Sequence, residues 1–376
     1  MAPALRKTEP MASPGGVFAL LKQERLLVLA VAVAILAYSA EHAIMGAGQF
    51  SAIIATIALI ATIVGVSIRV AHHAEVLAAK VGDPYGTMIL TLSAVLVEVI
   101  ILAILMSNST SPTLVRDTIY SAVMLDINGI LGLAALLGGI KFGEQPYNDD
   151  SGKTYGVMIL TAMGISMIVP EFVPADKWHL YSAFTICSMV TLYWVFLRNQ
   201  IGTHSYFFAY SYPPTKGEVR SHAADQPIGP SIALLIVGVV LIGILAEVMS
   251  QFLEFGLEGS GAPPVLAALV VAAISAAPEI LTALRAALAN RMQAVINIAL
   301  GASLSTVILT VPIMEGIALY TGQPFVMAMT PVQTVMVAIT LVVAAINLND
   351  GMTNAIEGMT HFILFATFVM LTVIGI

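Results

Sequence analysis

Eleven stretches of this chain are each apolar over about 20 residues, the length that an α-helix needs to cross a membrane. They span approximately residues 26–46, 49–69, 84–106, 117–140, 155–171, 178–198, 230–252, 263–284, 293–317, 326–347 and 358–376. Hydrophobic residues make up 59% of the chain and charged residues 10%, whereas a soluble domain carries about 25% charged residues. The sequence therefore predicts an all-α polytopic membrane protein with 11 transmembrane helices.

The fifteen Lys and Arg residues predict the orientation, because basic residues are retained on the cytoplasmic side of a membrane. With the N-terminus inside, only Arg116 and Lys177 fall outside, and the opposite topology would invert that distribution. We therefore expect a cytoplasmic N-terminus and an external C-terminus. A cleaved signal peptide over Leu26–Ala37 is the alternative for the first span.

A long polar interruption follows the sixth span. If the first span is set aside, it divides the other ten spans into five and five. Because five is odd, the second set enters the membrane from the opposite side, as in the inverted repeats that place a transporter's substrate site at the midplane. The expected organisation is a cytoplasmic N-terminal tail at 1–25, an extra N-terminal transmembrane helix at 26–48, a first five-helix repeat at 49–198, a cytoplasmic linker at 199–229 and a second five-helix repeat at 230–376.

In each half, the second span carries a lone glutamate near its middle. These are Glu98 and Glu279, each about fifteen residues after a Gly-x-Pro turn. A charged side chain at the bilayer centre costs about 2.5–3.5 kcal/mol on insertion scales, so an acid that persists there usually binds an ion or carries a proton. Two such acids in matching frames predict one shared cation site.

Further oxygens for such a site are predicted on the third span of each half, which is rich in small and polar residues. The side-chain candidates are Asn128, Ser303, Ser305 and Thr306. Backbone carbonyls of helices broken near Pro278 and Gly301 are the others. Ordinary helix packing through small residues is the alternative for these stretches. The proton or ion path has two more candidates, Glu247 and Asp126, whose alternative role is to face a wet vestibule or pair with another side chain.

Two polar clusters lie outside the predicted spans. His72, His73 and Glu75 are predicted to lie in a solvated cytoplasmic loop, with pH sensing as the alternative because histidine titrates near neutrality. The acidic segment with Glu144 and Asp149–Asp150 lacks the spacing of an EF-hand and is interpreted as a polar connector.

Three segments of the sequence carry a family resemblance. They are AEVLAAKVGDPYGTMILTLSAVLVEV, RDTIYSAVMLDINGILGLAALLGG and SAAPEILTALRAALANRMQAVINIALGASLSTVILTVP. They resemble the two alpha-repeats of ChaA-type bacterial calcium/proton antiporters, the CAX branch of the cation/calcium exchanger (CaCA) superfamily. The resemblance implies that Glu98 and Glu279 are the ion ligands. Leu96-Val97 and Ile280 depart from the polar residues that the wider family often has beside these glutamates.

The function that the resemblance implies is exchange of cytosolic Ca²⁺ for external H⁺ by alternating access in the bacterial inner (plasma) membrane. A Na⁺ or K⁺/H⁺ antiporter, or a broader divalent cation exchanger, is the alternative on the same fold. We expect calcium, protons and membrane lipid as partners, and no cofactor and no nucleic acid. A homo-oligomer is a further alternative. The chain lacks H-E-x-x-H and G-x-S-x-G motifs and a P-loop, so an enzyme or an ATP-driven pump is disfavoured. Buried titratable acids in inverted repeats fit exchange better than a passive channel.

Overall fold

The computed structural model describes residues 24–81, 85–108, 111–202, 204–212, 228–259, 263–323 and 325–375. Their α-helices are α2 (Arg25–Ser39), α3 (Glu41–Gly46), α4 (Gln49–Val81), α5 (Tyr85–Asn108), α6 (Leu114–Met124), α7 (Leu131–Phe142), α8 (Asp149–Met163), α9 (Trp178–Ile201), α10 (Ile228–Leu257), α11 (Pro264–Ser275), α12 (Ala277–Leu288), α13 (Met292–Ser305), α14 (Val311–Thr321), α15 (Pro331–Asn347) and α16 (Ala355–Ile374). Short helical pieces and two short strands connect them. About half of the predicted linker lies outside the described residues, as do nearly all of the predicted N-terminal tail and the turn before α5.

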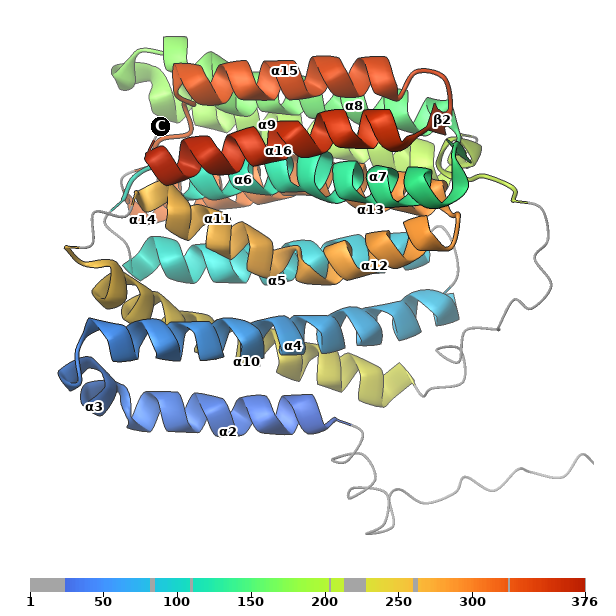
Figure 1. Cartoon of the computed structure of the whole chain (residues 1–376). Coiled ribbons are helices and arrows are strands. Elements are labelled where there is room, and N and C mark those ends of the chain that lie inside the picture. The colour runs from blue at the N-terminus through green and yellow to red at the C-terminus, as the bar shows by residue number, and fades with distance from the viewer. Residues whose placement is uncertain are drawn as a thin grey trace, which may run out of the picture.

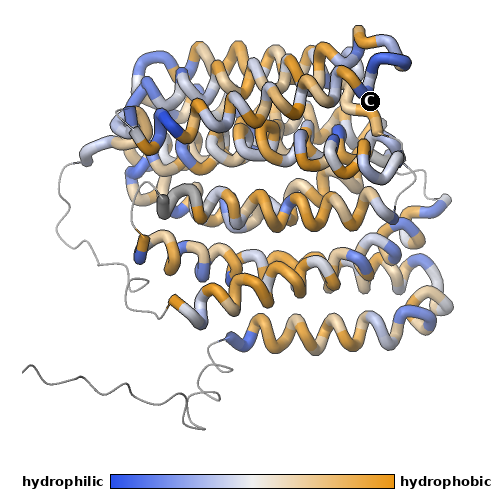
Figure 2. The backbone as a smooth tube through the Cα atoms, turned by 180° about the vertical axis from the view of Figure 1, so that it is seen from behind, coloured by the Kyte–Doolittle hydropathy of each residue, from blue (hydrophilic) through white to orange (hydrophobic). Residues whose placement is uncertain are grey.

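The helices run roughly side by side in one bundle, with α2, α4 and α10 along one edge and α8, α9 and α15 along the opposite edge (Figure 1). Hydrophobic residues colour the middle of the helices, and hydrophilic residues gather near their ends (Figure 2). Among the described residues, eight helices are long and apolar enough to cross a membrane, or nine if a bent pair counts as one span. The apolar helices α2 and α15 are shorter than these. The chain is therefore a multi-pass membrane protein.

The bent pair is α11 and α12, whose axes differ by 57° at the break around Ala276. Pro278 stands in the first turn of α12. Proline has no N–H to donate to the preceding turn and is well placed at a helix start, so it favours an interruption here. The sequence-based expectation of a break near Pro278 is confirmed. The first-half counterpart α5 is continuous through Glu98, which follows Val97 rather than a proline.

Two further spans contain π-helical turns in the middle of an α-helix. One span runs through α6, η1 (Leu125–Ile130) and α7, and the other through α13, η7 (Thr306–Thr310) and α14. Single π-helical turns inside α-helices frequently mark functional sites. The prediction of a broken helix near Gly301 is wrong, because α13 continues through that glycine. The π-helical turn η7 begins only after Ser305.

The two ends of the bundle can be told apart by the connections that meet there. At one end, strand β1 (Gln145–Pro146) pairs antiparallel with β2 (Met352–Thr353). At the other, Val326 N–H donates to the Pro112 carbonyl and Met329 N–H to the Met167 carbonyl, each at 2.9 Å. We call these the strand end and the opposite end. Helices α5 and α13 begin at the strand end, and α5 and α14 finish at the opposite end (Figure 1).

Helices α7 and α16 pack with their backbones in close approach, and glycines allow it. A Cβ on Gly358 would collide with the Leu136 backbone nitrogen and lie 2.7 Å from the Ala135 carbonyl carbon. Small residues allow this approach between membrane helices. Gly358→Ala is therefore expected to destabilise the protein by about 1–3 kcal/mol, as overpacking typically does. Thermal inactivation in detergent measures this. Gly156→Ala is the matched control, since its Cβ meets nothing within 4 Å, and equal stability of the two variants would contradict the packing argument.

Candidate cation site

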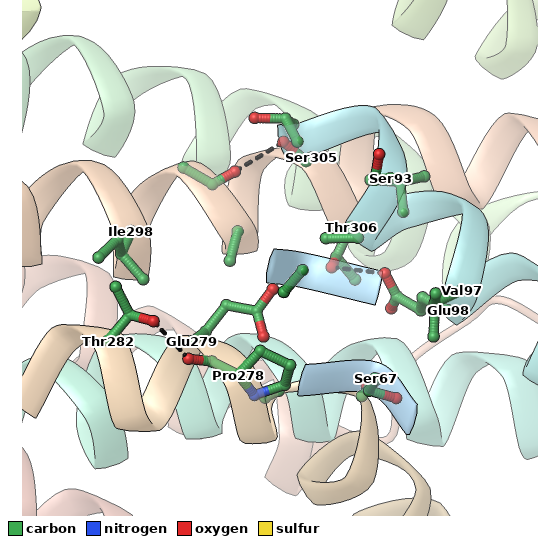
Figure 3. A pocket seen from close by; sticks show the side chains of 18 of the residues that line it. Ser67, Ser93, Val97, Glu98, Pro278, Glu279, Thr282, Ile298, Ser305 and Thr306 are labelled. Atoms are coloured by element: carbon green, nitrogen blue, oxygen red, sulfur yellow. Dashed lines mark hydrogen bonds between the residues drawn. The ribbon is translucent and has the colours of Figure 1, made fainter. Parts of the chain in front are cut away.

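A cavity of about 250 Å³ lies between α4, α5, η1, α12 and α13 in the middle of the bundle. The acids Glu98, Glu279 and Asp126 line it, together with hydroxyl groups that include those of Ser305 and Thr306. Figure 3 shows Glu98 and Glu279 pointing toward the same space from different helices. The cavity also reaches Glu75, Thr91 and Asn297, which lie in the strand-end halves of their helices.

Glu98 comes from the continuous helix α5 and is 6% exposed. Its Oε2 accepts a hydrogen bond from the Thr306 hydroxyl at 2.9 Å and another from the Thr310 hydroxyl at 3.2 Å. Its Oε1 is buried and has no hydrogen-bond partner. Such a buried oxygen is costly unless something binds it, so Oε1 is available to a ligand or a proton.

Glu279 stands in the first turn of α12, directly after the bend. It is partly exposed to the cavity, while its Oε2 is buried without a hydrogen-bond partner. The two glutamates lie close enough for their charges to interact. Acids are stabilised at a helix N-terminus by the helix dipole. Broken helices in transporters present their half-helix ends to substrate sites in the same manner.

Asp126 comes from η1 and is 2% exposed. Its Oδ2 accepts a hydrogen bond from the Ser303 hydroxyl at 3.2 Å. Its charge interacts with the charges of both Glu279 and Glu98. Within the described residues, no three His, Cys, Asp or Glu side chains come together closely enough to hold a metal ion. The cavity thus offers carboxylate and hydroxyl oxygens around a space that can hold several waters, without a closed coordination cage.

Three of the other predicted residues do not line this cavity, namely Asn128, Glu247 and Ser303, the last of which donates its hydrogen bond to Asp126. Asn128 donates to the Thr340 hydroxyl at 2.7 Å and lies 3.0 Å from Nδ1 of His361, so its amide is used between η1, α15 and α16. Residues two apart on a helix do not face the same way, which explains why Asp126 reaches the cavity and Asn128 does not. Glu247 is exposed on α10 and does not line the cavity.

The histidine cluster was expected in a solvated loop, and this expectation is wrong. His72, His73 and Glu75 lie on α4, which continues well past the apolar run. His73 is buried with its Nε2 3.5 Å from a Glu24 carboxylate oxygen, and Arg69 pairs with the same carboxylate. Glu75 is exposed and lines the cavity, so the cavity reaches the surface near the strand end.

Sequence reasoning missed Thr310, although its spacing of four residues from Thr306 is a signal that both hydroxyls reach the same neighbour. It also missed Ser67 of α4, which lines the cavity.

Together, the apolar helical bundle and the buried acidic cavity define a multi-pass membrane protein of the ion-transporter class. The chain belongs to the sodium/calcium exchanger protein family, whose model matches residues 51–202 and 230–374. This confirms the resemblance to the CAX branch of the cation/calcium exchanger superfamily.

Curated relatives agree with the family. The sodium-potassium/proton antiporter ChaA of Escherichia coli is 33% identical over 78% of this chain and 82% of its own length. The putative ionic transporter y4hA of Sinorhizobium fredii is 29% identical over 81% of this chain and 84% of its own length. These relatives are transporters rather than enzymes.

Solved structures agree on the fold. The structure of native YfkE has a TM-score of 0.73 at 15% identity and covers 93% of this chain and 99% of its own. The structure of the H⁺/Ca²⁺ exchanger CAX has a TM-score of 0.65 at 13% identity and covers 93% of this chain and 88% of its own. At these identities the likeness shows the fold alone.

Proposed function

We propose that the protein exchanges cytosolic Ca²⁺ for external H⁺ by alternating access, with Glu98 and Glu279 as the shared cation and proton site. The observation that carries the proposal is the pair of orphaned carboxylate oxygens, Oε1 of Glu98 and Oε2 of Glu279, buried at the same cavity. A carboxylate must lose its proton to coordinate a metal. Cation and protons therefore exclude one another at these oxygens.

Calcium suits this oxygen-rich cavity on chemical grounds. Ca²⁺ takes six to eight oxygen ligands from carboxylates, carbonyls, hydroxyls and water. Two glutamates neutralise its charge, and the Ser305 hydroxyl and water add neutral oxygens. Thiolate and imidazole ligands, which zinc and copper favour, are absent from the cavity lining within the described residues. Ser303 contributes indirectly, through its hydrogen bond to Asp126.

The finer architecture that we propose has 11 transmembrane helices, one N-terminal helix followed by two inverted five-helix repeats at 49–198 and 230–376. The bent pair and the shorter helices α2 and α15 supply the spans beyond the eight long ones. Equivalent positions support the repeat, because η1 and η7 begin the same number of residues after Glu98 and Glu279 respectively. With a cytoplasmic N-terminus, the strand end faces the cytoplasm of a bacterial inner membrane, and the cavity opens toward cytosolic cations.

A sodium or potassium/proton antiporter is the second candidate. It is favoured by the Escherichia coli relative ChaA, which is a sodium-potassium/proton antiporter. The same pair of carboxylates can take one monovalent ion and one proton. The third acid, Asp126, favours the divalent ion, since Coulomb attraction grows with the charge of the cation.

Direct ion competition in vesicles tests the choice of ion. The purified protein is placed in liposomes that hold a pH gradient, and Ca²⁺, Na⁺, K⁺ or Mg²⁺ is added outside. We expect Ca²⁺ to collapse the gradient at the lowest concentration. Collapse by Na⁺ or K⁺ with no response to Ca²⁺ would replace the calcium proposal with the second candidate. Net cation flux that moves no protons in return would exclude both.

A further inference from the structure

Three buried acids lie outside the cavity, and Glu24 and Asp117 pair with arginines, whereas the third has no such partner among the described residues. Glu315 of α14 is 2% exposed. Its carboxyl accepts a hydrogen bond from the Ser182 hydroxyl of α9, and its Oε2 is buried without a partner. No Lys, Arg or His of the described residues forms an ion pair with it. A buried carboxyl in this position needs a proton or a cation, because an isolated charge there is costly.

The neighbours of Glu315 offer no compensating charge. Helix α14 packs against α9, η7 and α5. On α9 the facing groups are Ser182 and Tyr181, whose hydroxyl donates to the Ile165 carbonyl at 2.7 Å. The only acid on α5 is Glu98, and η7 carries no titratable side chain. The surroundings are therefore hydroxyl groups and apolar side chains, which suit a proton better than a strongly hydrated metal ion.

The position of Glu315 along its span shows on which side of the paired glutamates it lies. From the strand end onward, Asn297 and Gly301 line the cavity, Thr306 and Thr310 hold Glu98, and Glu315 follows. At a rise of about 1.5 Å per residue, Glu315 lies about 8 Å beyond Thr310 toward the opposite end. Ser182 is likewise only about one turn from the start of α9 at Trp178. Glu315 thus lies between the paired glutamates and the opposite end.

We propose that Glu315, together with the Ser182 hydroxyl, binds the counter-transported proton on its route between the paired glutamates and the opposite end of the bundle. The inference rests on the proposed proton-coupled exchange. In the cycle, protonated Glu315 gives its proton through water to a glutamate that the cation has left, and the resulting carboxylate takes a new proton from the opposite side. The hydrogen bond from Ser182 stabilises the carboxylate while it is charged.

The test compares two modes of transport by the full-length protein in liposomes. One is calcium uptake driven by a pH gradient, and the other is exchange of calcium against radioactive calcium without a gradient, which needs no net proton movement. We expect Glu315→Gln to keep calcium/calcium exchange and to lower gradient-driven uptake at least about 10-fold, since a positioned proton carrier typically contributes 10²–10⁴-fold. The matched control is Glu171→Gln, which alters an exposed acid at the same end.

Glutamine is isosteric and still accepts the hydrogen bond from Ser182, so a purely structural carboxyl would leave both modes unchanged. That result would overturn the proposal, and so would an equal loss of both modes. Ser182→Ala gives a second test if Glu315→Gln does not fold. We expect a smaller but equally selective loss of gradient-driven uptake. Equal effects on both modes of transport would contradict the proposal. Should wild type carry sodium rather than calcium, the proposed ion fails, and the same comparison with radioactive sodium decides the role of Glu315.

Discussion

Glu98→Gln and Glu279→Gln are each expected to abolish proton-coupled calcium uptake and to weaken calcium binding by about 100-fold or more. Removing one partner of a buried charge interaction costs about 3–5 kcal/mol, and every 1.4 kcal/mol is a tenfold change in affinity. Each substitution also removes one of the two oxygens that lack a partner at the cavity. Uptake into liposomes and equilibrium calcium binding to the purified variants measure the two effects.

The control for these variants is Glu258→Gln, which neutralises an exposed acid near the end of α10. It is expected to transport as wild type does, so that a general loss of charge is separated from loss of the site. Wild-type uptake by either Glu98→Gln or Glu279→Gln would refute the assignment of that glutamate.

Asp126→Asn is expected to lower calcium affinity by about 10–100-fold, which corresponds to about 1.4–2.7 kcal/mol. Asparagine retains an acceptor for the Ser303 hydroxyl but removes the charge that interacts with both glutamates. Because Coulomb energy scales with the charge of the ion, the loss is larger for Ca²⁺ than for Na⁺. Competition binding with both ions measures the difference.

Asp176→Asn serves as the control for Asp126, since Asp176 is exposed and its ion pair with Lys177 lies at the surface. Equal losses for Ca²⁺ and Na⁺ in Asp126→Asn would show that this aspartate acts through packing rather than through its charge. Unchanged calcium affinity would remove it from the site altogether.

The parts of this site that could be predicted from the sequence are those with a local signal. Lone acids in apolar stretches stand out by their insertion cost, which is why Glu98 and Glu279 were identifiable. Pro278 likewise predicts the bend of its span, because a proline in the middle of an apolar run removes a backbone hydrogen bond to the preceding turn. That Glu98 and Glu279 meet at one cavity depends on the packing of helices distant in the sequence, and only the structure shows it.

Other residues were misjudged or not singled out, because their burial and orientation depend on tertiary packing. Asp126 and Asn128 look equivalent in the sequence, and the orientation of η1 decides which of them faces the cavity. Glu315 stands near the end of an apolar run, where a solvated acid is ordinary, and packing of α9 buries it. His73 follows the last apolar residues of its span, yet α4 continues to Val81, because the residues between them are compatible with a helix and include no Gly or Pro.

The central idea is that calcium and protons compete for the carboxylates of Glu98 and Glu279. Calorimetric titration of the purified protein with calcium, repeated over a pH series in buffers of different ionisation enthalpy, measures both affinity and proton release. Ligating carboxylates must be deprotonated, so we predict that calcium affinity falls as the pH falls and that each bound ion releases at least one proton. Calcium binding with the same affinity at every pH and without proton release would contradict the account.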